Sequence, residues 1–160
     1  MEHEAIVSTV TEVAVALTGF TGVVAVLGHR SQGEWSPAER LQLRTLVETS
    51  LTALFASFLP GLLLAAEMSD PVTWRLANGT LGALHAANFI AFARRAKNAE
   101  TTPSQRALIV LGIMTVLAHA LAALDVVPLH AAIFVFGLIQ QLFVASLNFV
   151  LLLFPLRSPA

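Results

Sequence analysis

The sequence predicts an all-α integral membrane protein in which five transmembrane helices form one bundle. Mean hydropathy is +0.77 and 56% of the residues are hydrophobic. Only 12% are charged, far below the roughly 25% typical of soluble domains. Five apolar runs along the 160 residues approach or exceed the 20 or so needed to cross a bilayer. We therefore expect one transmembrane domain, residues 1–160, in the plasma (inner) membrane.

The first helix is expected over residues 5–28, a run whose one carboxylate is Glu12. Ser8, Glu12, Ala16 and Gly19 share one face of this helix. Such small residues let two helix backbones approach closely. We expect another helix to pack against this face.

The second helix is expected over residues 37–66. Ser36 and Glu39 have the spacing of a capping box, and Pro37 stands at the first helical position. The helix should therefore start before the membrane does. Pro60, which is followed by a glycine, predicts a kink.

Proline also marks the start of the remaining three helices, because it is tolerated in the first turn. These helices begin near Pro71, Pro103 and Pro128 and are expected over residues 71–97, 103–124 and 128–154. Only three residues separate the fourth helix from the fifth. Those two helices should form a tight antiparallel hairpin.

The fifth helix carries polar residues along its whole length. His130, Gly137, Gln141 and Asn148 fall within about 40° of one another on a helical wheel, and we call this line the polar seam. Lipid cannot solvate an imidazole or a carboxamide. The polar seam should therefore face other helices, a cofactor or water.

Basic residues predict the orientation, because they collect in cytoplasmic loops. They flank the first and third connections and the tail, as Arg30, Arg40, Arg44, Arg94, Arg95, Lys97, Arg106 and Arg157. With five spans this places the N-terminus outside and the C-terminus in the cytoplasm.

A rise of 1.5 Å per residue converts sequence position into depth. His85 and Gln141 then lie about 18 to 20 Å from the outer surface, and His119 lies about 8 Å from it. The candidate polar path takes one or more residues from four helices: Glu12, Arg75, Asn78, His85, His119, His130, Gln141 and Asn148.

Two ion pairs are expected. Glu12 and Arg75 lie at nearly the same depth and suit a structural pair, with a proton or cation site at Glu12 as the alternative. Arg44 and Glu48 are spaced i, i+4 near the cytoplasmic surface and suit an interfacial pair. His85 is expected either to bond between helices or to act as a ligand or proton relay.

Several kinds of chemistry find no support. No hydrolase, metalloprotease or phosphate-binding motif occurs, so we expect no enzyme and name no catalytic or metal-ligating residue. With no cysteine there is no disulfide and no thiolate metal site. We expect no resident cofactor, because His85 and His119 differ in depth and haem b would need another axial ligand. A net charge of -1 argues against nucleic acid as a partner.

These observations favour a small channel or carrier for protons, ions or a small polar solute, with its path lined by the third and fifth helices. Carboxamides also join membrane helices, so the polar seam fits interhelix bonding equally well. Five short helices enclose little volume, and we expect a homo-oligomer in the lipid bilayer. The alternative is a non-catalytic accessory subunit, or one that binds a cofactor or pigment, in a larger membrane complex.

Overall fold

The computed structural model describes residues 2–31, 35–96 and 103–153, with side chains over 7–23, 35–95 and 109–153. Within these ranges the regular elements are all α-helices. They are α1 (Glu2–Ser31), α2 (Pro37–Ser57), α3 (Leu59–Ala65), α4 (Asp70–Ala96), α5 (Pro103–Ala123) and α6 (His130–Leu153). Because α2 and α3 are the two parts of the second predicted helix, the all-α, five-helix prediction is confirmed. The predicted helix ends at 97 and 154 lie outside the described residues, as do Lys97, Arg157 and the side chains of Arg30 and Arg106.

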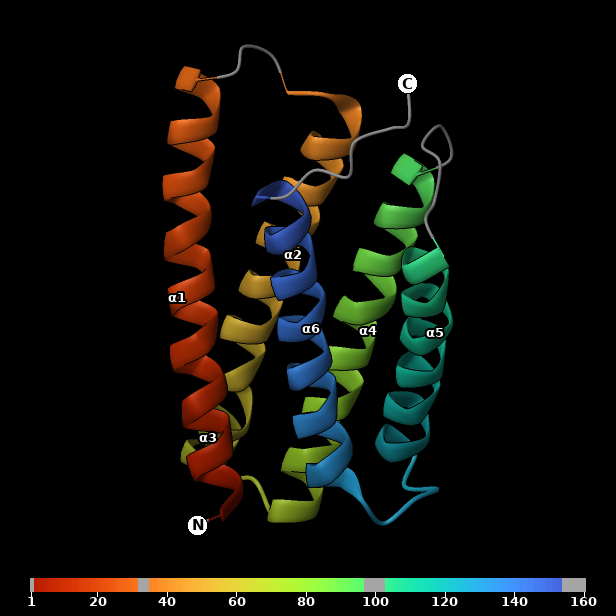
Figure 1. Cartoon of the computed structure of the whole chain (residues 1–160). Coiled ribbons are helices and arrows are strands. Elements are labelled where there is room, and N and C mark those ends of the chain that lie inside the picture. Colours follow the sequence, from red (N-terminus) through yellow and green to blue (C-terminus); the bar gives the residue numbers. More distant parts are fainter. Residues whose placement is uncertain (1, 32–34, 97–102, 154–160) are drawn as a thin grey trace.

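The long helices run side by side and alternate in direction (Figure 1). α1 begins at one end of the bundle and α6 ends at the other. Within the described residues α6 contacts α1, α2, α4 and α5, whereas α1 packs against α2 and α6 alone. The helix that carries the polar seam is therefore the central one.

The start of α2 is fixed by the predicted capping box. Ser36 Oγ accepts a hydrogen bond from the Glu39 N–H at 3.2 Å, and the Ser36 N–H donates to Glu39 Oε2 at 2.8 Å. These hydrogen bonds with Ser36 lower the pKa of the Glu39 carboxyl, because they favour its charged form.

The second helix is interrupted at Phe58, where α2 ends and α3 begins. Pro60 lies two residues further on and has no N–H with which to continue the hydrogen-bond pattern of α2. The break thus falls one turn or less from the predicted kink.

The interior is as polar as it is apolar. Among the residues whose side chains are described, thirteen polar residues are buried beside thirteen apolar ones, while large apolar side chains such as Phe20, Phe55, Leu62, Phe136 and Phe143 are exposed. Soluble monomers rarely expose continuous apolar surface on this scale. The outside of this bundle is suited to an apolar surrounding.

In the described ranges, two helices, Pro37–Ala65 and His130–Leu153, are long and apolar enough to cross a membrane. Among the described residues, Val7–Val23 and Ile109–Ala123 form shorter apolar helices. α4 corresponds to another predicted span but is not among these helices. Polar and charged residues, including Arg75, Asn78 and His85, interrupt its apolar residues.

The small-residue face of α1 does not pack within this chain. Glu12 and Gly19 are exposed, and a Cβ added at Gly19 or Gly22 would meet no atom within 4 Å. Instead α1 buries the face that carries Val10 and Ala14. The expectation of close packing at this face is therefore not met inside the described monomer.

Candidate functional site

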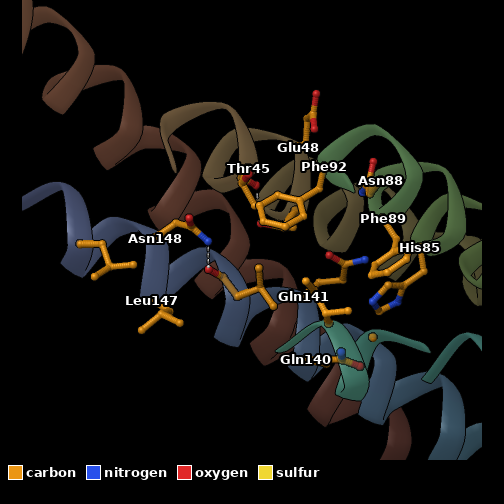
Figure 2. A pocket seen from close by; sticks show the side chains of 15 residues that line it. Thr45, Glu48, His85, Asn88, Phe89, Phe92, Gln140, Gln141, Leu147 and Asn148 are labelled. Carbon is orange, nitrogen blue, oxygen red and sulfur yellow. Dashed lines mark hydrogen bonds between the residues drawn. The ribbon is translucent and has the colours of Figure 1, made fainter. Parts of the chain in front are cut away.

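A cavity of about 90 Å³ lies between α2, α4, α5 and α6 (Figure 2). It extends from the middle of α6 toward the end of that helix. Its walls combine amide, hydroxyl and imidazole groups with aromatic and aliphatic side chains: Thr45, Glu48, Thr49, His85, Asn88, Phe89, Phe92, Ile109, Gly112, Gln140, Gln141, Val144, Leu147, Asn148 and Leu151.

Three polar atoms on this lining are buried and have no hydrogen-bond partner within the described part of the chain. They are His85 Nδ1, Gln140 Oε1 and Gln141 Nε2. Figure 2 shows the side chains of His85 and Gln141 reaching into the same space between α4 and α6. An unsatisfied buried polar atom costs about 1–3 kcal/mol. The cavity carries several polar groups and has room for several water molecules beside these residues.

Other polar groups of the lining are already satisfied by the protein. Asn88 Nδ2 donates to Thr52 Oγ1 at 2.8 Å and so joins α4 to α2. Asn148 Nδ2 donates to the Val144 carbonyl at 2.8 Å, within α6 itself. Asn148 of the polar seam therefore forms its hydrogen bond within α6. The side chains with unpaired polar atoms, His85, Gln140 and Gln141, lie near the middle of the seam.

A charged cluster ties α2 to α4 beside the cavity. Arg44 Nε donates to Glu48 Oε1 and Arg95 Nη1 donates to Glu48 Oε2, each at 2.8 Å. The Arg44–Glu48 pair has the i, i+4 spacing seen in the sequence. Arg95 was not expected as a partner, because it lies 47 residues along the chain and only the packing of α2 on α4 brings it near.

Asn78 fixes the orientation of His119, which neighbours His85 but does not line the cavity. Asn78 Nδ2 donates to the carbonyls of Trp74 and His130, both at 2.8 Å. Its Oδ1 lies 2.8 Å from His119 Nδ1 and can only accept. The proton of a neutral His119 is therefore on Nδ1, and Nε2 carries the lone pair.

Two glycines make room for His119. A Cβ at Gly82 would stand 2.8 Å from the His119 Cβ, and a Cβ at Gly137 would overlap Nε2 of the same ring. His119 is fully buried and fills the space between α4 and α6. The His119 side chain therefore fills the interior beyond the end of the cavity at which His85 lies.

His85 and His119 are closer than expected. Their ring centroids are 6.1 Å apart, so the prediction that they lie at well separated depths is wrong. Counting residues along each helix ignores helix tilt and the reach of the side chains. The contact between Gly137 and His119 leaves no space for a porphyrin on that ring, and a haem bound between the two histidines does not fit.

The expected pair between Glu12 and Arg75 is not formed. Arg75 Nη1 lies 3.7 Å from Asp125 Oδ2, and its Nε donates to the Ala123 carbonyl at 3.2 Å. His130 Nε2 lies 3.0 Å from Asp125 Oδ1. In the part of the chain that the structure describes, α1 does not pack against α4, so Glu12 does not reach Arg75. The sequence analysis did not predict Asp125 as the partner of Arg75. The available signal was its position in the α5–α6 connection, at the same end of the bundle as the start of α4.

The structure therefore divides the predicted path into separate groups. His85, Gln141 and Asn148 line the cavity, Asn78 and His119 close the interior, and the third group lies at the end where α6 begins. That third group joins Arg75 and His130 through Asp125. Glu12 belongs to none of them.

Comparisons with protein-family models, with curated proteins and with solved structures found no match to this chain. The function of the protein is therefore inferred from the chemistry of its site.

Proposed function

We propose that the five helical regions all span a membrane, with the N-terminus outside and the C-terminus in the cytoplasm. The apolar exterior supports this, since it surrounds an interior in which half of the buried residues are polar. The five helical regions, with α1 beginning at one end of the bundle and α6 ending at the other, suit such a topology. Arg44 and Arg95 then lie on the cytoplasmic side, where basic residues concentrate.

Within that bundle the protein serves as a small channel or carrier for a polar solute or ion. The observation that carries this proposal is the set of unsatisfied atoms at His85, Gln140 and Gln141 around a cavity in the middle of the helices. A path through a bilayer needs such groups to replace hydration at the point farthest from either aqueous phase. If these side chains served only to join helices, we would expect their polar atoms to be hydrogen-bonded to one another.

A second candidate function, an accessory subunit, is compatible with the exposed face of α1. Glu12 is exposed on α1 next to the exposed Ala16 and Gly19. A carboxylate facing lipid is costly, and small residues admit a neighbouring helix. A second copy of the chain fits this face under the channel proposal, and a different subunit fits it under the alternative.

Transport by proteoliposomes that contain only this chain distinguishes the two functions. Proton entry is followed with a pH-sensitive dye, and entry of small polar solutes is followed by vesicle swelling. Replacing Gln141 with Leu keeps a similar volume and removes both hydrogen-bonding functions. We expect flux to fall by about tenfold or more while stability changes little, since interhelix bonds in membranes average about 0.6 kcal/mol.

Thr73→Val is the matched control, because Thr73 is fully buried and its Oγ1 is unpartnered but does not line the cavity. It should leave flux unchanged. Absence of protein-dependent flux for every solute, together with copurifying partner chains, would replace the channel proposal with the accessory one.

A further inference from the structure

We propose that the cavity between α2, α4, α5 and α6 binds an uncharged molecule of a few heavy atoms that offers both a hydrogen-bond donor and an acceptor, such as a small primary amide. This inference rests on the proposed function and names the class of its solute. It follows from the hydrogen-bonding groups, the charges and the space that the lining presents.

The lining presents a complementary pair of unsatisfied groups. Gln140 is 4% exposed and leaves its carbonyl oxygen free to accept, and Gln141 is 1% exposed and leaves its amide nitrogen free to donate. A ligand that satisfies both must itself carry a donor and an acceptor. His85 Nδ1 adds a third free position at the same cavity.

The charge of the lining disfavours an ion. The titratable residues on it are Glu48 and His85. Both carboxylate oxygens of Glu48 are already bonded, by Arg44 and by Arg95. Figure 2 shows this carboxylate pointing away from His85 and the two glutamines. A charge placed among those glutamines would have no counter-charge in a region of low dielectric constant, which is unfavourable.

The size and shape of the site limit the ligand further. The cavity measures about 90 Å³, and beyond His85 the interior is closed by His119 against Gly82 and Gly137. Phe89 and Phe92 supply an apolar wall. A short molecule with one amide end and one methyl end matches both halves of this lining.

Acetamide and acetate are suitable probes, because they have the same number of heavy atoms and nearly the same shape but differ in charge. Binding to the full chain in lipid nanodiscs is measured by saturation-transfer NMR on each probe. We expect a signal for acetamide and about tenfold or more weaker binding of acetate. Equal signals for the two probes, or none for acetamide, would overturn the proposal. This comparison uses the wild-type chain and does not depend on how a variant folds.

Gln141→Leu should abolish the acetamide signal, whereas Thr73→Val should retain it in full. An acetamide signal that survives Gln141→Leu would place the binding elsewhere and contradict the assignment. The same samples in proteoliposomes separate this inference from the proposed function. Binding of acetamide without flux of any solute supports the site and rejects transport. Flux of protons or acetate without acetamide binding supports a path and rejects the neutral ligand.

Discussion

At the scale of single residues, the most constrained group is His119. Its Nδ1–H is directed at Asn78 Oδ1, because both hydrogens of the Asn78 amide nitrogen are used by backbone carbonyls. The ring can therefore accept a further proton only at Nε2. That atom is buried beside Gly137 and has no partner in the described residues.

This arrangement predicts the tautomer of His119. The ¹⁵N chemical shifts of its ring should report a protonated Nδ1 and an unprotonated Nε2 at neutral pH. Asn78→Leu removes the acceptor and should mix the two tautomers. An Nε2–H tautomer in the wild-type protein would contradict the hydrogen-bond assignment.

Replacing Gly137 with a larger residue is predicted to destabilise the protein. Its added Cβ would overlap the His119 ring, so Gly137→Ala should destabilise the bundle by about 1–3 kcal/mol, the usual cost of overpacking. Gly61→Ala, on α3 and away from the small-residue face of α1, is the control. Nothing lies within 4 Å of a Cβ there, and alanine favours a helix by up to about 1 kcal/mol. Unfolding in detergent titrations measures both, and equal effects would remove the packing argument.

At the scale of elements, the cap of α2 is expected to depend on pH. The pKa of Glu39 is lowered in the fold, so its contribution to stability is fully present above the reference pKa of 4.5. It is lost as the pH falls through the lower pKa of the folded state. The melting temperature of the wild-type protein should therefore drop more steeply on acidification than that of Glu39→Gln. Parallel curves would show that the capping box does not contribute.

Removal of the hydroxyl on the same cap tests the other half of the box. Ser36→Ala leaves the Glu39 N–H without its acceptor and should cost about 1 kcal/mol. Ser36→Thr keeps a hydroxyl and should restore most of that stability.

The junction between α2 and α4 depends on Glu48. Double-mutant cycles should give a larger coupling for Glu48 with Arg95 than with Arg44. The Arg95 side chain is 29% exposed and bonds across two helices, whereas Arg44 is 62% exposed and lies on the same helix as Glu48. We expect about 0.5–1 kcal/mol for the first pair and about 0.3 kcal/mol for the second. The reverse order would show that this cluster does not hold the helices together.

At the scale of the whole molecule, features set by residues close together in the sequence were predictable. The five helical regions, the capping box at Ser36 and the inward face of Gln141 and Asn148 follow from apolar runs, spacing and helical period. Contacts between helices were not predictable in the same way. The approach of His85 to His119 and of Arg95 to Glu48 depends on helix tilt and on which helices are neighbours.

The pairing of Glu12 with Arg75 failed for the same reason. Equal depth places two groups in the same layer but says nothing about their position around the bundle. α1 and α4 lie on different sides of α2 and α6, so Arg75 instead finds Asp125 in the nearby α5–α6 connection.

The proposed transport function requires a hydrated cavity inside a bundle whose exterior faces lipid. Because the chain has no cysteine, single cysteines can be introduced without background. Val144 lines the cavity, and the adjacent Phe143 is 56% exposed on the outside of α6. In inside-out membrane vesicles, which present the cytoplasmic ends of the helices to the reagent, Val144→Cys should react with a small membrane-impermeant thiol reagent and Phe143→Cys should not. Labelling of Phe143→Cys with Val144→Cys unreactive would contradict the account, because the outside would be in water and the interior dry.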